Sequence, residues 1–122
     1  MEKKKTLIMG ASTKPGRYAL LAAEMLDDHG HPAVLFGKRE GMVRGNKILT
    51  SLNEIPADID TVTMYLSENN QTEYEDFIID LKPKRVIFNP GAENFEFEDR
   101  LQSAGIEPIE ACTLVMLSTG QY

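Results

Sequence analysis

The stretch that decides the fold is Thr6-Leu7-Ile8-Met9-Gly10-Ala11-Ser12-Thr13-Lys14-Pro15-Gly16-Arg17. Its apolar beginning predicts a strand, the residues from Gly10 predict a turn, and a helical spacing of apolar residues follows directly. Backbone N–H groups at such a turn point outward, and the helix dipole adds partial positive charge there. Lys14 and Arg17 place two cationic side chains beside those donors. The stretch therefore predicts a phosphate-binding turn.

The rest of the chain alternates strand patterns with helix patterns. Apolar runs predict strands over residues 6–10, 33–36, 48–49, 61–66, 85–88 and 108–109, and helical spacing predicts helices over 16–29, 71–81 and 94–104. Strands that alternate with helices form parallel sheets covered on both faces, so this order predicts the α/β class. Right-handed crossovers then give a Rossmann-like, doubly wound fold with a mainly parallel sheet of five to six strands and helices on both faces.

A few residues predict where these elements begin and end. Gly30 and Gly105 stand where left-handed caps close two of the helices. Ser51-Leu52-Asn53-Glu54 has the spacing of a capping box, and Asn94 occupies an N-cap position. The apolar tail over residues 112–117 is expected to dock on the body of the same chain.

The length of 122 residues predicts a single domain over residues 1–122. No apolar run approaches the roughly 20 residues that a membrane helix needs. The basic start leads into a short strand rather than a signal peptide. One cysteine, Cys112, cannot form an internal disulfide. We therefore expect a cytoplasmic protein without a membrane partner.

The charge is unevenly distributed along the chain. The net charge of −6 argues against nucleic acid as a partner. Residues 1–50 nevertheless carry nine Lys and Arg against five Asp and Glu, whereas residues 51–122 carry four against fourteen. An anionic small ligand is therefore expected at the N-terminal half.

The glycine pattern of the first turn argues against NAD. In the dinucleotide fingerprint G-x-G-x-x-G, the second and third glycines are replaced by Ser12 and Pro15. Ser12 suits either a helix cap or a hydroxyl that contacts phosphate. Residues Gly37-Lys38-Arg39 stand where an NAD site places an acid. Two cations there fit a ribose phosphate, which leaves NADP, with its 2′-phosphate, and coenzyme A, with its 3′-phosphate, both open.

The pattern Gly10-x-Ser12-x-x-Pro15-x-Arg17 resembles the opening motif of small stand-alone CoA-binding domain proteins, which are similar to the N-terminal domain of the succinyl-CoA synthetase α subunit. The resemblance extends over nearly the whole chain, through Gly91 with Glu93-Asn94 and the lone Cys112. It implies that Gly10, Ser12, Lys14, Pro15 and Arg17 line the pyrophosphate, that Gly37, Lys38 and Arg39 face the 3′-phosphate or adenosine, and that Tyr65, Leu66 and Ser67 pack near the ligand.

No pattern in the sequence predicts catalysis or a metal site. His29 and His31 lie at the carboxyl end of the first helix and just after it, at the edge of the sheet opposite the ligand crevice, and they lack metal-ligating partners. Cys112 is interpreted either as a buried small hydrophobe or as a thiol near the ligand. We therefore predict non-catalytic, regulatory binding of coenzyme A or an acyl-CoA. An NADP-binding oxidoreductase and a degenerate Rossmann interaction protein without ligand stay open as alternatives, and so does a homo-oligomer.

Overall fold

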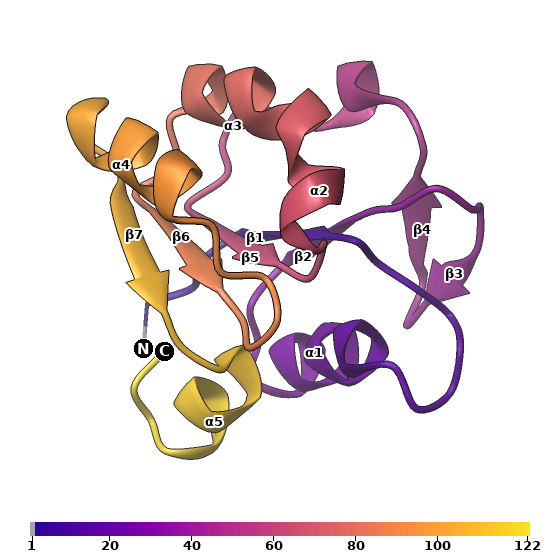
Figure 1. Ribbon diagram of the computed structural model, residues 1–122. Coiled ribbons are helices and arrows are strands. Elements are labelled where there is room, and N and C mark those ends of the chain that lie inside the picture. Colours follow the sequence, from indigo (N-terminus) through magenta and orange to yellow (C-terminus); the bar gives the residue numbers. More distant parts are fainter. Residues whose placement is uncertain (1) are drawn as a thin grey trace.

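The computed structural model describes residues 2–122 (Figure 1). Its strands are β1 (Thr6–Met9), β2 (Ala33–Phe36), β3 (Met42–Val43), β4 (Asn46–Leu49), β5 (Thr61–Met64), β6 (Arg85–Phe88) and β7 (Glu107–Glu110). Its helices are α1 (Tyr18–Asp28), α2 (Glu68–Gln71), α3 (Glu75–Leu81), α4 (Phe95–Ser103) and α5 (Thr113–Ser118), with short 3₁₀ turns η1 (Leu52–Glu54) and η2 (Thr72–Tyr74).

The strands form one sheet in the order β3-β4-β2-β1-β5-β6-β7. All neighbours pair in parallel except β3 and β4, which form an antiparallel hairpin at one edge. The predicted Rossmann-like, mainly parallel sheet is thus confirmed, with seven strands instead of five to six. The additional strand is β3, whose two residues are too few to show a periodicity in the sequence.

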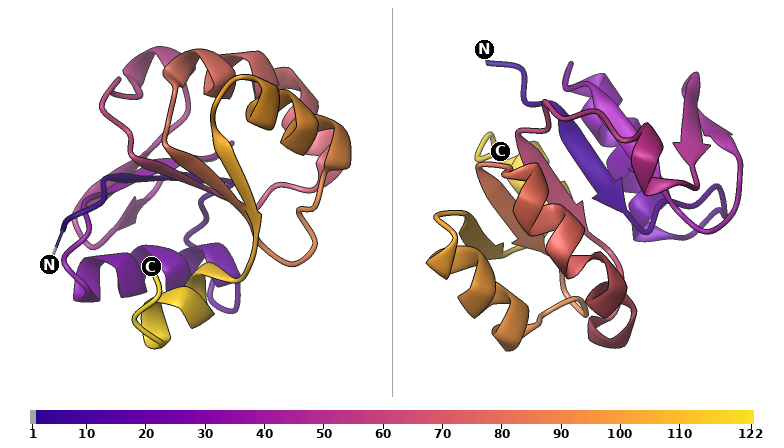
Figure 2. Two further views of the ribbon diagram at one scale, coloured as in Figure 1. Left: turned by 90° about the vertical axis from the view of Figure 1, so that its left-hand side faces the viewer. Right: turned by 90° about the horizontal axis from the view of Figure 1, so that it is seen from above.

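Helices cover both faces of the sheet, as Figure 2 shows. Helices α1 and α5 lie on one face, and η1, α2, α3 and α4 lie on the other. Each face has its own buried apolar cluster, one including Leu26 and Leu117, the other including Phe88 and Phe97. The tail predicted to dock on the same chain is α5, which packs beside α1.

The helix predicted over residues 71–81 is broken into α2, η2 and α3. Gln71 is wholly buried, and its side-chain amide donates to the carbonyl oxygens of Leu66 (2.8 Å) and Ala92 (2.7 Å). A side chain held inward at this point joins the loops that follow β5 and β6. Apolar periodicity could not show the break, because the residue that marks it is polar.

The predicted caps have mixed outcomes. Gly30 and Gly105 adopt the left-handed conformation, with φ of +79° and +80°. The Asn94 side chain accepts a hydrogen bond from the Phe97 backbone N–H, as an N-cap does. One helical turn, η1, follows Ser51 as expected, but the Ser51 side chain makes no cap hydrogen bond, so the predicted capping box is not formed.

The buried side-chain amide of Asn89 joins the carboxyl ends of β5 and β6. The Asn89 side chain donates to Thr63 Oγ1 (2.8 Å) and to the Met64 carbonyl oxygen (2.9 Å). Its Oδ1 accepts from the Thr113 backbone N–H (2.9 Å), where α5 begins. Asn89 therefore joins β5, β6 and α5 at one point.

His31 lies at the opposite edge of the sheet, where sequence analysis placed it. It is 6% exposed, and its Nδ1 accepts from the Lys4 backbone N–H (3.0 Å), which requires the neutral ring. Burial lowers the pKa of His31 below its ordinary value near 6.5, and the neighbouring charges of Lys4, His29 and Arg85 lower it further, against Asp60. Protonation therefore favours the unfolded chain.

We expect the free energy of unfolding to fall as the pH falls below about 6.5, where the unfolded chain binds the proton first. The decrease in unfolding free energy is complete once the pH falls below the lowered pKa of His31 in the folded chain. His31→Asn keeps an acceptor that does not titrate, so this variant should lose less stability between pH 7.5 and 5.5 in urea titrations. Equal losses in the variant and the wild type would contradict the assignment to His31.

Candidate functional site

A cleft of about 670 Å³ lies at the carboxyl ends of the central strands. The turn after β1 and the loop after β2 form one side, and residues that follow β5 and β6 form the other. Its lining comprises Gly10, Ala11, Ser12, Thr13, Lys14, Gly16, Arg17, Tyr18, Ala19, Phe36, Gly37, Lys38, Arg39, Glu40, Ile48, Tyr65, Leu66, Tyr74 and Pro90. This is the edge at which open α/β sheets bind ligands.

The turn after β1 is held in place by hydrogen bonds to the end of β2. The backbone N–H groups of Gly10 and Ala11 both donate to the carbonyl oxygen of Phe36, at 3.0 and 2.8 Å. The Ser12 hydroxyl accepts from the Lys14 backbone N–H (3.0 Å). It closes a local turn and does not cap α1, which begins only at Tyr18, because the turn continues through Pro15 and Gly16.

Unused donors remain on this turn. Within residues 2–122, the backbone N–H groups of Ser12, Thr13 and Gly16 have no acceptor. The N-terminus of α1 lies next to them and contributes positive potential. Several N–H groups beside a helix N-terminus form a suitable cradle for phosphate oxygens.

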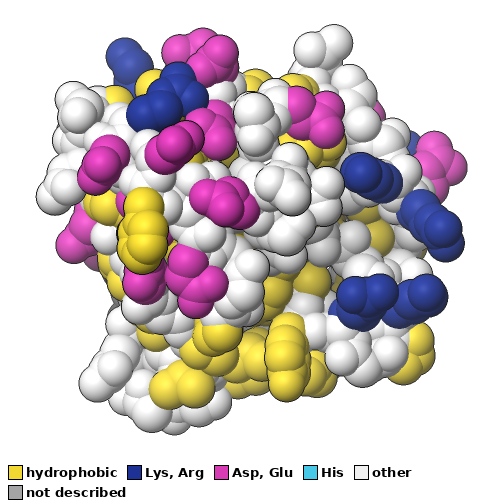
Figure 3. All heavy atoms as spheres, viewed as in Figure 1, with side chains coloured by type: hydrophobic (Ala, Val, Ile, Leu, Met, Phe, Trp, Pro, Cys, Tyr) yellow, Lys and Arg dark blue, Asp and Glu magenta, His cyan; other side chains and the backbone are white. Residues whose placement is uncertain are grey.

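Cationic side chains surround the cradle. Lys14, Arg17, Lys38 and Arg39 are exposed, and none of them forms an ion pair with another residue in the described part of the chain. Dark blue side chains gather along the right of Figure 3, over the first turn and the β3–β4 edge. Glu40 contributes one negative charge to the lining. The excess of positive charge attracts a ligand with several phosphates.

Gly37 lies where the end of β2 passes directly over the first turn. A Cβ at this position would be 2.6 Å from the Ala11 carbonyl oxygen. The Gly37 backbone N–H donates to the Leu49 carbonyl oxygen (3.0 Å), so the strand end has little freedom to move away. The structure thus explains Gly37 by close approach of two backbone segments, whereas the sequence suggested a ligand contact.

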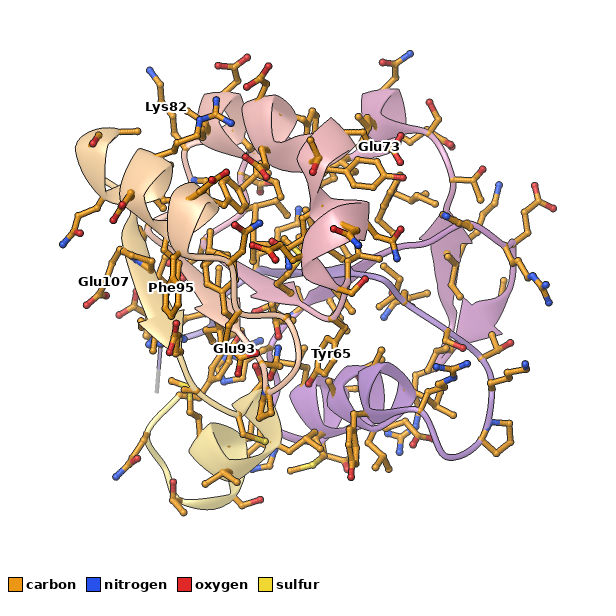
Figure 4. All side chains as sticks on the ribbon, viewed as in Figure 1. Tyr65, Glu73, Lys82, Glu93, Phe95 and Glu107 are labelled. Atoms are coloured by element: carbon orange, nitrogen blue, oxygen red, sulfur yellow. The ribbon has the colours of Figure 1, made fainter. Side chains whose placement is uncertain are left out.

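The remaining wall of the cleft is apolar and aromatic. Tyr65 follows β5 and extends toward α1 in Figure 4. Its hydroxyl oxygen is buried without a hydrogen-bond partner within residues 2–122. Burial, with a smaller contribution from Cys112, raises the pKa of Tyr65 to about 12, so the hydroxyl keeps its proton. Leu66 packs against Gly10, and Pro90 completes this side.

The fold brings most predicted site residues to one cleft. Gly10, Ser12, Lys14, Arg17, Gly37, Lys38, Arg39 and Tyr65 all line it. Pro15 and Ser67 do not: Pro15 is an exposed turn residue, and the Ser67 hydroxyl accepts from the Asn70 side chain (3.0 Å). Sequence reasoning missed Tyr74, which reaches the cleft from η2, far along the chain. Pro90 lies in the segment 89–94 after β6, one of the strand ends expected at the ligand crevice.

No group of three or more His, Cys, Asp and Glu side chains within residues 2–122 is arranged to hold a metal ion. Among the helices described, none has the length and apolar character that a bilayer span requires.

Comparison with known proteins identifies relatives. Residues 4–118 match the CoA binding domain family. A solved structure of an uncharacterized protein is 48% identical, with a TM-score of 0.94 over 100% of both chains. A hypothetical protein from Pyrococcus horikoshii OT3 is 27% identical, with a TM-score of 0.85 over 96% of this chain and 82% of that chain. No curated protein matches.

The cell-free ID.343 structure from Thermus thermophilus is 20% identical and shows the fold alone, with a TM-score of 0.87 over 98% of this chain and 91% of that one. The family match is more informative, because it includes the first turn, the loop after β2 and the residues after β5 and β6. The resemblance inferred from Gly10-x-Ser12-x-x-Pro15-x-Arg17 is thereby confirmed. The chain belongs to the CoA binding domain family.

Proposed function

We propose that the protein binds coenzyme A or an acyl-CoA in this cleft without catalysing a reaction, and that binding serves a regulatory role. The observation that carries the proposal is the set of cations without ion-pair partners in the described chain, Lys14, Arg17, Lys38 and Arg39, around the free N–H groups of the first turn. The family of the chain supports coenzyme A as the ligand.

The phosphates of coenzyme A match two separate parts of the cleft. The pyrophosphate is assigned to the first turn, where Arg17 can form paired hydrogen bonds with it. The 3′-phosphate is assigned to Lys38 and Arg39, at the end of β2, where adenosine lies in dinucleotide-binding folds. NADP carries its additional phosphate on the ribose 2′-oxygen, so the position of that phosphate separates the two ligands.

The chemistry of the lining supports binding without catalysis. Within the described residues, the cleft is lined by no His, Cys or Asp. Its one carboxylate, Glu40, belongs to the cationic loop after β2, and the raised pKa of Tyr65 keeps its hydroxyl protonated, so that it cannot accept a proton. These groups provide no activated nucleophile.

Calorimetric titration with CoA, dephospho-CoA, NADP and NAD tests the proposal. CoA should bind most tightly, and dephospho-CoA should bind about 10- to 100-fold more weakly, the range expected for lost hydrogen bonds to a charged group. No saturable response to millimolar CoA, or a preference for NADP, would overturn the proposal.

Charge-reversal variants locate the phosphates. Arg17→Glu should weaken CoA and dephospho-CoA alike by at least about 10-fold, because both carry the pyrophosphate. Lys38→Glu should weaken CoA selectively, which reduces the difference between the two ligands. Lys82→Glu is the matched control, because Lys82 is exposed at the end of α3, away from the cleft (Figure 4). If Lys82→Glu weakens CoA binding as much as Arg17→Glu does, the net charge of the protein attracts the ligand and the cleft is not a specific phosphate site.

A further inference from the structure

An apolar band lies beside the cleft, over α1 and α5. Tyr18, Leu21 and Val115 are 68%, 42% and 56% exposed, although all are large and apolar. Met25 and Met116, on the same two helices, are half-buried. Figure 3 shows apolar side chains as a yellow region across the lower part of the molecule, where α1 and α5 lie side by side. A contiguous exposed apolar surface often marks a binding site, whereas single exposed apolar residues are common on any protein.

The orientation of α1 shows which flank is apolar. Arg44, from the β3–β4 hairpin, pairs with Asp27 (3.0 Å) and Asp28 (2.9 Å) at the end of the helix. At 100° per residue, Tyr18 and Met25 lie on the flank opposite Asp27, and Leu21 lies between Met25 and Asp28 on the outer side of the helix. Because the hairpin contacts α1 on the Asp27 side and α5 packs on the other side, the flank with Tyr18 and Met25 is the one that faces α5.

The band continues the apolar end of the cleft. Tyr18 belongs to both, since it lines the cleft and is exposed on α1. Pro90 lines the cleft next to Asn89, and Asn89 accepts from the first backbone N–H of α5 (2.9 Å). The end of the cleft at Pro90 therefore lies near the start of α5.

The two ends of the cleft differ in chemistry. The cationic residues follow β1 and β2, whereas Tyr65 and Pro90 follow β5 and β6, on the other side of β1 in the sheet. A ligand that matches this arrangement has phosphates at one end and an apolar group at the other. Free coenzyme A ends in a thiol and leaves the band uncovered, whereas an acyl thioester carries an apolar chain to this point.

We propose that the band over α1 and α5 receives the acyl chain of a bound acyl-CoA, so that the preferred ligand is a CoA thioester with an extended apolar chain. This inference rests on the proposed function, because the phosphates must occupy the cleft for the chain to reach the band. Tyr18 and Met25 are seven residues apart, about 10 Å along α1. The gain in affinity should level off once the chain extends beyond Met25.

A chain-length series tests the inference on the wild-type protein. CoA, acetyl-CoA, butyryl-CoA and octanoyl-CoA are titrated by calorimetry, each below its micelle concentration. A methylene group with about half its surface covered should tighten binding about twofold. Octanoyl-CoA should therefore bind roughly 60-fold more tightly than acetyl-CoA, which has six fewer methylene groups.

Polar variants locate the chain. The double variant Leu21→Gln with Val115→Gln changes two exposed side chains without adding charge, so it should fold and keep its affinity for CoA. It should lose most of the gain from acetyl-CoA to octanoyl-CoA. Phe95→Gln is the matched control, because Phe95 is 74% exposed on α4, on the other face of the sheet, and this variant should keep the full gain.

The outcomes separate this inference from the proposed function. Equal affinities for CoA and octanoyl-CoA would overturn the acyl site and leave CoA binding intact, whereas no binding of any member would overturn both. A chain-length gain that survives in the double variant would place the chain elsewhere and overturn the inference. Analytical ultracentrifugation measures the oligomeric state of the wild type and the double variant. If the wild type is a dimer, the double variant is a monomer, and affinity does not rise with chain length, the band binds a second copy of this chain and the inference is overturned.

Discussion

Gly37→Ala is expected to destabilise the protein by about 2–3 kcal/mol, the upper part of the range for overpacked cores. The new methyl group would lie 2.6 Å from the Ala11 carbonyl oxygen, and both contact partners are held by backbone hydrogen bonds. Neither the end of β2 nor the first turn can move without weakening the hydrogen bonds that Phe36 accepts from Gly10 and Ala11. Urea unfolding measures the loss.

The same substitution should weaken CoA binding at least about tenfold, because the displaced turn carries the N–H groups assigned to the pyrophosphate. Gly41→Ala is the matched control. Its Cβ would also meet an atom at 2.6 Å, but that atom is Thr13 Cγ2, the end of an exposed side chain that can rotate. Equal losses of stability in the two variants would refute the argument from backbone crowding at Gly37.

Asn89→Ala is expected to cost about 3 kcal/mol of unfolding free energy. The substitution removes three buried hydrogen bonds, and the Thr113 backbone N–H is left without its acceptor. Unsatisfied buried groups cost about 1–3 kcal/mol each, and the partial rearrangement of Thr63 and Thr113 recovers some of this cost. Chemical denaturation monitored by circular dichroism measures the change.

Asn69→Ala is the control for asparagine removal, because Asn69 is exposed on α2, and its effect should stay within about 0.5 kcal/mol. Hydrogen exchange adds a local measurement. The Thr113 amide should exchange much faster in Asn89→Ala than in the wild type. If stability falls and Thr113 remains protected, Asn89 contributes through packing and not through the junction with α5.

The central strands were predictable because they are buried on both faces. β1 and β5 are wholly buried, so β1 appears in the sequence as an apolar run after Thr6, and β5 as a run of threonine, valine and methionine that favours a strand. β3 has two residues at the sheet edge and no periodicity, and the break after α2 depends on the inward turn of a polar residue, Gln71. Both features depend on tertiary contacts that a local pattern does not contain.

In the candidate site, too, some residues could be predicted from the local sequence and others depend on tertiary contacts. Lys14, Arg17, Lys38 and Arg39 could be predicted because each follows a strand, and the carboxyl ends of parallel strands meet at one edge. Residues 89–94, including Pro90, could be expected there for the same reason, whereas Tyr74 could not, since its distance from the first turn is set by the packing of α2 and α3. The close approach of Gly37 to Ala11 likewise appears only when β2 is laid beside β1.

The sheet order also determines how firmly each half of the cleft is held. β1 is paired on both sides and wholly buried, so hydrogen exchange from it requires opening of nearly the whole domain. The loop with Lys38 and Arg39 leads instead into the short β3–β4 hairpin at the edge, which opens at lower free energy. The part of a ligand bound at the first turn would thus contact a rigid backbone, whereas the part bound at Lys38 and Arg39 would contact a loop that can shift. Ligands that differ in structure at the ribose end could therefore bind, whereas ligands that differ at the pyrophosphate could not.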